Sequence, residues 1–211
     1  MKVLISVPNG GQIHKAVVGR LLLLQRDDRY ELEFSMPVYK PYENNLHHLV
    51  KEFLKGDYHY WLSIDSDNPP KRNPLDLVEL DLDLVGLPTP FWQPKEGKNI
   101  FLNGFDYVVE KDTYAEHLPQ KGLQQVDAVG TGCFIAARRV FEDKELQKGA
   151  FIRKLNSDGT VRRGTDISFC ERVRTRGFKI WCHYDYQCQH FKNLDLGEIV
   201  MAYESNIKSV R

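Results

Sequence analysis

The chain has 211 residues, of which 42% are hydrophobic and 27% are charged, as in an ordinary globular protein. Lysine plus arginine and aspartate plus glutamate each total 29, so the formal net charge is zero. This balance excludes an overall electrostatic attraction to nucleic acid or to an anionic membrane, and any phosphate-binding site must therefore be local.

The N-terminal apolar stretch is too short for a signal peptide, and no apolar stretch is long enough for a transmembrane segment. We therefore expect a cytoplasmic protein whose four cysteines are reduced.

The first half of the chain alternates predicted strands with predicted helices. Extended apolar stretches predict strands over residues 2–7, 30–36, 58–64 and 82–87. Helical spacing of apolar residues predicts helices over residues 14–26, 45–55 and 74–80, the last with Asn73 as its N-cap. Strands separated by helices indicate βαβ units and a mainly parallel sheet with right-handed crossovers.

The second half has shorter strands and more turns. Residues 101–111 predict a hairpin that turns at Asn103-Gly104. A helix is predicted over residues 165–176, followed by Gly177. Further predicted elements are strands over residues 126–129, 133–137, 179–182 and 186–190, and a last helix over residues 194–208. We expect one domain over residues 1–211, with a parallel half at about 1–90 and a mixed half at about 91–211, either as a whole protein or as one domain of a longer chain.

Two carboxylates, in Asp65-Ser66-Asp67, directly follow the apolar residues 58–64 and precede Pro69-Pro70. Proline cannot donate to a sheet ladder, so the strand must end at the acidic pair. Ligands bind at the carboxyl ends of strands in open α/β sheets. Hard oxygen ligands at that position suit a divalent cation, Mn²⁺ or Mg²⁺, that also holds a diphosphate. The alternative is a polar turn after a strand.

His190 ends another predicted strand, and Lys192 follows it closely. Imidazole is a common metal ligand, and the ammonium could neutralise a leaving diphosphate; the alternative is a partly buried, hydrogen-bonded histidine. A zinc site is a further alternative for the group Cys182, His183, Cys188 and His190. The spacing of that group does not match the usual paired arrangement, and buried thiols are the simpler interpretation.

Two more sites have both a structural and a functional interpretation. Gly130-Thr131-Gly132 lies between two apolar runs and is either a tight turn or a loop where backbone approaches a sugar. Its spacing does not fit the dinucleotide fingerprint, so a nicotinamide cofactor is not supported. Asp166 opens a predicted helix, where it is either a favourable helix charge or a general base directed into a cleft.

Arg162 and Arg163 lie on a predicted loop next to Gly164. They are either a solvated basic loop or a loop that closes over a diphosphate. Trp92 lies between prolines in a predicted loop, where it is either packed on the core or a platform for the face of a sugar.

The order and spacing of four blocks resemble the GT-A-fold nucleotide-sugar glycosyltransferases. The blocks are Val7-Pro8-Asn9, residues 56–67 ending in Asp65-Ser66-Asp67, residues 127–141 around Gly130-Thr131-Gly132, and residues 164–180 around Asp166. The resemblance covers nearly the whole chain and looks like a compact member of the kind found in bacteria and large DNA viruses; a viral member would act in the host cytoplasm. It implies an α/β, Rossmann-like fold whose mostly parallel central sheet is flanked by helices, with a nucleotide-binding first half and a smaller, mixed antiparallel part on the acceptor side.

The resemblance also implies roles for residues at matching positions. The donor nucleotide would be bordered by Pro8, Asn9, Asp65, Ser66 and Asp67. The metal site would be Asp65, Asp67 and His190, and the diphosphate contacts would be Arg162, Arg163 and Lys192. The sugar and acceptor contacts would be Trp92, Gly130, Thr131, Gly132 and Asp166.

Asp166 matches the acid of the family's Glu-Asp motif, but Thr165 stands where glutamate is usual. In an inverting enzyme Asp166 would deprotonate the acceptor hydroxyl, whereas in a retaining enzyme it would orient a sugar hydroxyl. Both courses stay open, with a slight preference for inversion.

The sequence thus predicts a metal-dependent glycosyltransferase that moves a hexose or deoxyhexose from a UDP-sugar to a hydroxyl of a carbohydrate or glycoprotein acceptor. One alternative is a nucleotidyltransferase, which would normally carry arginine or lysine in a glycine-rich loop after the first strand; residues 8–12 carry neither. The other alternative is a non-catalytic nucleotide-sugar-binding module.

Overall fold

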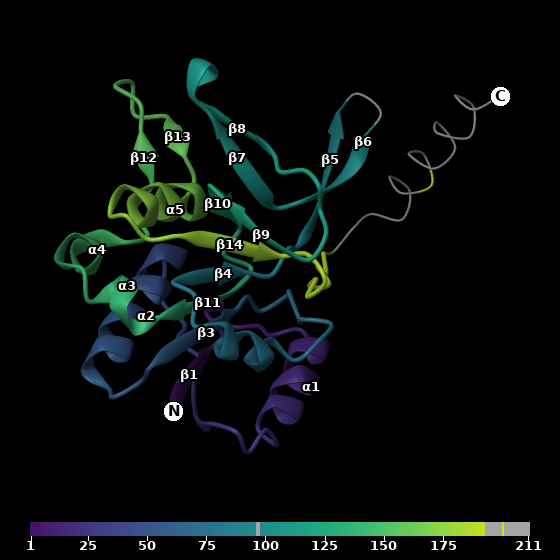
Figure 1. Ribbon diagram of the computed structural model, residues 1–211, viewed down its shortest axis with the longest axis vertical. Coiled ribbons are helices and arrows are strands. Elements are labelled where there is room, and N and C mark those ends of the chain that lie inside the picture. The colour runs from purple at the N-terminus through teal and green to yellow at the C-terminus, as the bar shows by residue number, and fades with distance from the viewer. Residues whose placement is uncertain (96–97, 193–199, 201–211) are drawn as a thin grey trace.

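The protein is represented by a computed structural model that describes residues 1–95, 98–192 and 200. The strands of its main sheet are β1 (Lys2–Ser6), β2 (Glu31–Ser35), β3 (Tyr60–Ile64), β4 (Leu84–Gly86), β9 (Leu123–Val126), β11 (Cys133–Ala137) and β14 (Ile180–His183). These seven strands lie in the order β2-β1-β3-β11-β4-β14-β9 (Figure 1). The α-helices are α1 (Lys15–Leu24), α2 (Tyr42–Lys55), α3 (Arg138–Phe141), α4 (Lys144–Gly149) and α5 (Thr165–Thr175), and the 3-10 helices are η1 (Pro74–Leu80) and η2 (Val109–Lys111).

Most strands of the main sheet run in one direction. β1 pairs in parallel with β2 and β3, and β14 pairs in parallel with β4. β11 is antiparallel to both β3 and β4, so β4 keeps the direction of β3, and β9 is antiparallel to β14. The predicted α/β class with a mostly parallel sheet flanked by helices is therefore confirmed. The carboxyl ends of β1, β3, β4 and β14 and the start of β11 meet at the same edge of the sheet.

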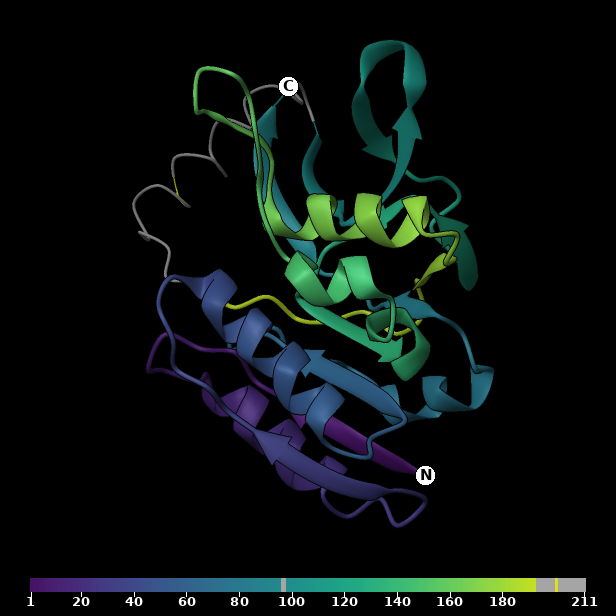
Figure 2. The same cartoon turned by 90° about the vertical axis from the view of Figure 1, so that its left-hand side faces the viewer.

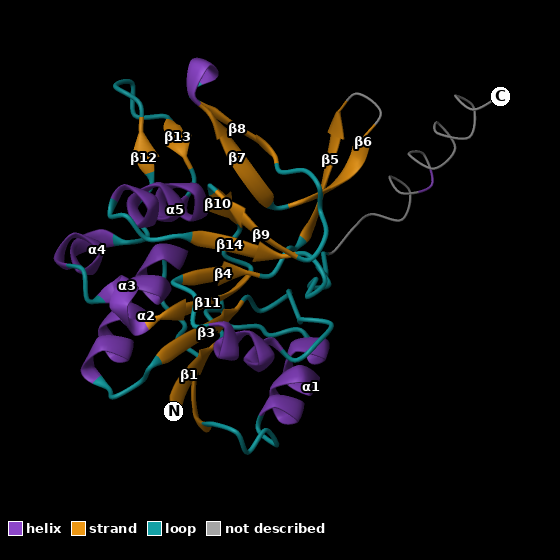
Figure 3. Cartoon of the chain, viewed as in Figure 1, coloured by secondary structure: helices purple, strands orange, loops and turns teal. Residues whose placement is uncertain are grey.

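Three small antiparallel sheets accompany the main sheet in the second half of the chain (Figure 3). They are formed by β5 (Pro90–Lys95) with β6 (Lys98–Leu102), by β10 (Ala128–Val129), β7 (Gly104–Val108) and β8 (Thr113–Glu116), and by β12 (Lys154–Leu155) with β13 (Val161–Arg163). Three of their hairpins, β5–β6, β7–β8 and β12–β13, project from the same end of the molecule (Figure 1).

The prediction of a hairpin that turns at Asn103-Gly104 is wrong. β6 ends before Asn103 and pairs with β5, whereas β7 begins at Gly104 and pairs with β8 and β10. Asn103 instead makes long-range contacts: its side-chain oxygen accepts from the backbone N of Thr89 at 2.7 Å, and its carbonyl accepts from the backbone N of Gly130 at 3.0 Å. These two bonds join three segments at the sheet edge, and the local turn signal gave no indication of them.

The strand predicted at residues 186–190 is also wrong. After β14 the chain continues as an irregular segment, residues 184–192, which we call the strap. The backbone N of Cys188 donates to the carbonyl of Pro88 at 3.0 Å, and that of Gln189 donates to Pro69 at 2.9 Å. The strap is thus attached to the loops at Pro69 and Pro88 by individual backbone hydrogen bonds, and not by the continuous hydrogen-bond ladder of a β-strand. The helix predicted over residues 194–208 falls outside the described residues, apart from Val200.

Helices cover the main sheet (Figure 2), and an apolar core lies on each of its two faces. The core under α2, α3 and α5 is rich in aromatic rings, with Trp61 packed between Phe134 and Phe141 at centroid distances of 5.2 Å each. The fully buried indole of Trp61 donates to the hydroxyl of Ser6 at 2.8 Å. The other core contains the inner face of α1 and three residues of η1, Leu75, Leu77 and Val78. None of the described helices has the length and apolar character needed to cross a membrane.

Candidate functional site

A pocket of about 340 Å³ lies at the sheet edge where β3 and β4 end and β11 begins. The predicted site residues in its lining are Asp65, Asp67, Gly130, Thr131, Gly132, Asp166, His190 and Lys192. Its other lining residues, which we did not predict as site residues, are Asn68, Thr89, Phe91, Asn103, Phe105 and Ile167. Residues from widely separated parts of the sequence therefore share one pocket, which contains three carboxylates and two basic side chains.

Asp65 follows β3 directly and is tied to the glycine-rich turn. Its backbone N donates to the carbonyl of Gly132 at 2.8 Å, and one of its carboxylate oxygens accepts a hydrogen bond from the hydroxyl of Tyr42. Burial raises the pKa of Asp65 to about 7, although the bond from Tyr42 favours the charged form. Because this pKa is close to neutral pH, a cation in the pocket would favour the charged form of Asp65.

Asp67 joins the end of β3 to the strap. One of its carboxylate oxygens lies 2.5 Å from Nζ of Lys192 and 3.6 Å from Nε2 of His190. Nδ1 of His190 lies 2.7 Å from the carbonyl oxygen of Pro90, which can only accept, so Nδ1 carries a proton. In the neutral ring Nε2 is therefore an unprotonated nitrogen that faces Asp67.

Asp67 and His190 carry donor atoms of the kinds that bind divalent cations. A histidine that binds a metal through one ring nitrogen usually donates its other N–H to a carbonyl or carboxylate, as His190 does. The ammonium of Lys192 also shows that Asp67 accepts a positive charge at this position. Asp65 lines the same pocket, but within residues 1–95 and 98–192 no three His, Cys, Asp or Glu side chains are arranged as a ready metal site. The predicted trio therefore shares one pocket, and the contact is between Asp67 and His190.

The zinc alternative has less support from the geometry. Cys182 packs in the core beneath α2, whereas Cys188 packs in the core that contains α1. The two thiols thus lie in different cores and do not form one ligand set with His183 and His190. All four cysteines are free and buried.

Gly130 and Gly132 allow amide side chains to pack directly on the backbone. A Cβ on Gly130 would overlap the amide of Asn103; one on Gly132 would overlap Asn68 and approach the Thr89 hydroxyl to 3.0 Å. The space is thus occupied by three neutral polar side chains that line the pocket. The Thr89 hydroxyl is buried and has no hydrogen-bond partner among the described residues. It is therefore available to form a hydrogen bond with a ligand in the pocket.

Asp166 enters the pocket from the first turn of α5. Its carboxylate accepts a hydrogen bond from the backbone N of Ile167 at 2.8 Å, yet burial raises its pKa above the ordinary value. A raised pKa makes the carboxylate a better proton acceptor near neutral pH. The neighbouring Thr165 hydroxyl donates at 3.3 Å to Glu43, in the first turn of α2.

Three predicted nucleotide contacts, Pro8, Asn9 and Ser66, are not in the pocket lining. Asn9 is buried, and its amide nitrogen donates to the carbonyls of Val7 and Pro37 at 3.0 and 3.3 Å. Its amide oxygen accepts from the backbone N of residue 11 at 2.9 Å. Because both ends of the amide are bonded to backbone, Asn9 shapes the loop that follows β1.

Arg162 and Arg163 also lie outside the pocket lining, at the end of β13. Arg162 forms an ion pair with Asp112, and Arg163 pairs with Asp112 and Glu171 at 2.8 and 3.0 Å. Of the three predicted diphosphate contacts, Lys192 is the one that lines the pocket. Trp92 lies on β5 rather than in the predicted loop, and its side chain is outside the described part of the chain.

Tyr42 was missed because α2 begins at residue 42 instead of the predicted residue 45. Pro41 immediately before it was an available signal, because proline favours the start of a helix. Asn103 and Thr89 gave no such signal, since their position in the pocket depends on contacts between distant segments.

The sequence matches no protein-family model and no curated protein. The crystal structure of A197 from STIV aligns with a TM-score of 0.60 and 16% identity, over 92% of this chain and 87% of that chain. A glycosyltransferase involved in the glycosylation of the major capsid of PBCV-1 aligns with a TM-score of 0.46 and 12% identity, over 92% of this chain and 96% of that chain. Apo UDP-glucose pyrophosphorylase aligns with a TM-score of 0.48 and 11% identity, over 90% of this chain and 92% of that chain.

The likeness to A197 shows a shared fold at low sequence identity. The other two proteins carry out different reactions and align less closely. A shared fold does not by itself establish a shared function.

Proposed function

We propose that this protein is a glycosyltransferase that uses a UDP-sugar with Mn²⁺ or Mg²⁺ and transfers a hexose or deoxyhexose to a hydroxyl of a carbohydrate or glycoprotein acceptor. The observation that carries the proposal is the contact between Asp67, at the carboxyl end of β3, and Nε2 of His190 on the strap. The pocket lies at the carboxyl edge of the sheet, where ligands bind in α/β folds. It offers oxygen and nitrogen atoms to a cation and a nearby ammonium to a phosphate, which together suit a nucleoside diphosphate with its cation. The GT-A-like order of the sequence blocks supports the same reaction class.

Asp67 and His190 would hold the cation, and Asp65 would add a second carboxylate in the same pocket. When bound, the cation would stabilise the negative charge of the leaving nucleoside diphosphate. Lys192 now pairs with Asp67, and once a cation neutralises that carboxylate the ammonium would be available to a phosphate oxygen.

The neutral wall of the pocket would receive the donor sugar. The amides of Asn68 and Asn103 and the unpartnered hydroxyl of Thr89 are suited to hydrogen bonds with sugar hydroxyls. Gly130, Thr131 and Gly132 would border the donor sugar and the acceptor. The three carboxylates of the pocket would repel an acidic sugar, which favours an uncharged hexose or deoxyhexose.

Asp166 would act on the acceptor. As the acceptor oxygen bonds to the anomeric carbon and the bond from that carbon to the diphosphate breaks, Asp166 would take the proton of the acceptor hydroxyl. Burial in the pocket raises the pKa of Asp166, which supports this role.

A thermal-shift screen of nucleotide sugars with and without Mn²⁺ tests the proposal. We expect stabilisation of the wild type only when Mn²⁺ and a UDP-sugar are both present, loss of that stabilisation in Asp67→Asn, and retention in Asp185→Asn, which changes an exposed carboxylate of the strap. Equal stabilisation of wild type and Asp67→Asn would contradict the assigned cation site.

Product analysis separates the proposed reaction from its alternatives. A glycosyltransferase should release UDP when an acceptor is supplied. Formation of UDP-sugar from UTP and a sugar phosphate would indicate a nucleotidyltransferase instead, and ligand binding without turnover of any donor would indicate a binding module.

A further inference from the structure

Helix α1 is apolar on its outer side as well as on its inner side. Val17, Leu21 and Leu24 are buried against the sheet, whereas Leu22 and Leu23 are 58% and 55% exposed. Val18, one turn before Leu22, is also exposed. The outer face of α1, defined here as Val18, Leu22 and Leu23, is therefore an exposed apolar surface in the described part of the chain.

The charged side chains of residues 15–26 are all positive, and Asp27 and Asp28 follow them. α1 contains no acidic residue; Lys15, its first residue, and Arg26, two residues beyond its last, are both exposed. Arg20 lies at one margin, where its guanidinium donates to the carbonyl of Lys71 at 2.9 Å. A second copy of the chain docked by two-fold symmetry would bring these cations against one another, so the face is better suited to an acidic, apolar partner.

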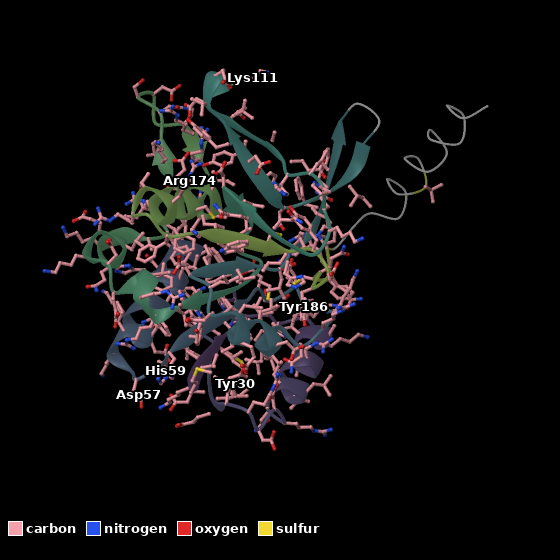
Figure 4. All side chains as sticks on the ribbon, in the orientation of Figure 1. Tyr30, Asp57, His59, Lys111, Arg174 and Tyr186 are labelled. Carbon is pink, nitrogen blue, oxygen red and sulfur yellow. The ribbon has the colours of Figure 1, made fainter. Side chains whose placement is uncertain are left out.

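The strap ends beside the first turn of α1. The ring of Phe191 stacks on that of His14, the N-cap of α1, with centroids 3.9 Å apart and planes at 18°. The backbone N of Phe191 also donates to the carbonyl of Asp67 at 3.0 Å. Tyr186, also on the strap, lies on the side of the molecule where α1 lies (Figure 4). Whatever follows Lys192 therefore begins within reach of α1.

The sequence that follows has the complementary pattern. Between residues 194 and 208 five apolar residues recur at helical positions i, i+3, i+4, i+7 and i+11, which would place them on one face: Leu196, Ile199, Val200, Tyr203 and Ile207. Leu194 and Met201 fall on the other side of the same pattern. Of the acidic residues of this stretch, Asp195 and Glu204 would flank that face, whereas Glu198 would lie opposite it. Val200, which is described, is 53% exposed. Fifteen helical residues would span about 22 Å, enough to cover a ten-residue helix of about 15 Å.

We propose that residues 194–208 dock as an amphipathic helix on the outer face of α1, with their apolar side on Val18, Leu22 and Leu23 and their flanking acidic side chains near Lys15 and Arg26. The exposed apolar face of α1 and an apolar sequence pattern with flanking acidic residues, which begins just after the strap, would thereby cover each other. Docking would also anchor the strap from its far end and so fix His190 and Lys192 in the pocket. The proposal does not depend on the reaction that the pocket carries out.

Engineered cysteines test the docking directly, because the four native cysteines are all buried. Leu22→Cys combined with Val200→Cys should form an intramolecular disulfide under mild oxidation with copper–phenanthroline. The control combines Val200→Cys with Val109→Cys, which is 71% exposed on η2 at the tip of the β7–β8 hairpin. Lys111, which ends η2, is at the opposite end of the molecule from α1 (Figure 4).

Peptide mapping by mass spectrometry should find at least about tenfold more disulfide between positions 22 and 200 than in the control pair. The reason is that two thiols held together by docking have a much higher effective concentration than two thiols that are only linked through the chain. Equal yields in the two pairs, or disulfides between chains in the 22–200 pair, would overturn the proposal, the latter in favour of a second copy.

Hydrogen exchange provides a second, independent readout. Replacing Ile199 and Tyr203 by Asp removes apolar residues from the proposed docking side of the segment. We expect the solvent-side amides of α1 to exchange severalfold faster in this variant than in the wild type. Unchanged exchange of α1 would show that the segment does not cover it.

Discussion

Arg138, the first residue of α3, holds the C-terminal end of α2. Its Nη1 donates to the carbonyls of Phe53, Gly56 and Tyr58 at 3.3, 2.8 and 3.1 Å. Its Nη2 donates to the carbonyl of Leu54 at 2.9 Å. The last carbonyls of a helix have no partner within the helix, so Arg138 satisfies groups that would otherwise need water or another donor. Because α2 begins at the Tyr42 that binds Asp65, this anchor lies at the other end of an element that shapes the pocket.

Arg138→Met removes these four bonds together with the exposed ion pair between Nε of Arg138 and Glu142 at 2.9 Å. Methionine keeps much of the apolar stem but removes the charge and every donor. A hydrogen bond to a charged group contributes about 1.5–3 kcal/mol, and the total is smaller than the sum because carbonyls at a helix end can return to water. We expect the free energy of unfolding to fall by about 2–4 kcal/mol. Arg138→Lys should recover only part of this loss, because an ammonium lacks the planar fork.

Arg139→Met is the matched control. The adjacent arginine pairs mainly with Asp81 and Asp83 at 2.8 and 2.6 Å, with its own side chain 42% exposed. Exposed ion pairs contribute about 0–1 kcal/mol, so the loss should stay within that range. Urea unfolding followed by circular dichroism gives both values. Losses that agree within about 0.5 kcal/mol would refute the argument that the helix-end carbonyls make Arg138 special.

Two further predictions concern the pocket and the response to acid. Gly132→Ala should lower the free energy of unfolding by about 1–3 kcal/mol, because the new Cβ would overlap the Asn68 amide. Gly10→Ala is the control: its Cβ would meet nothing within 4 Å, so the free energy of unfolding should change by less than about 0.5 kcal/mol. Urea unfolding measures both variants, and a similar loss in the two would contradict the prediction. Arg29 holds the pKa of Asp27 well below its usual range, so the pair stabilises the fold above the unfolded pKa of about 4, and that stability is lost as the pH falls toward the lower folded pKa. The stability deficit of Asp27→Asn should therefore be largest near pH 7 and shrink below pH 4, and a deficit independent of pH would count against the pairing.

Local sequence patterns predicted the parts of the site that depend on one element at a time. The apolar residues before Asp65 and the prolines after Asp67 determined where β3 ends, because burial and the missing proline N–H act locally. The position of Asp166 at the start of α5 followed from helical spacing in the same way. The pairing of Asp67 with His190 was expected from the resemblance, and the structure brings the two side chains together.

Residues whose role depends on distant segments were not predictable. Asn103 looked like a turn residue, but its amide bonds to Thr89 and packs on Gly130, which come from other parts of the chain. Arg162 and Arg163 looked like free cations, yet Asp112 and Glu171 neutralise both. In each case a long-range partner outweighed the local signal, and periodicity contains no information about such partners.

The central claim is that Asp67 and His190 hold a divalent cation together with a nucleoside diphosphate. Pulsed electron paramagnetic resonance of the protein loaded with Mn²⁺ and UDP tests it most directly, since a nitrogen bound to Mn²⁺ gives a characteristic hyperfine coupling. We predict that this coupling is present in the wild type, absent in His190→Gln, and retained in His48→Gln, whose imidazole is exposed. A coupling that survives in His190→Gln, or a wild type that retains no Mn²⁺ in the presence of UDP, would contradict the claim.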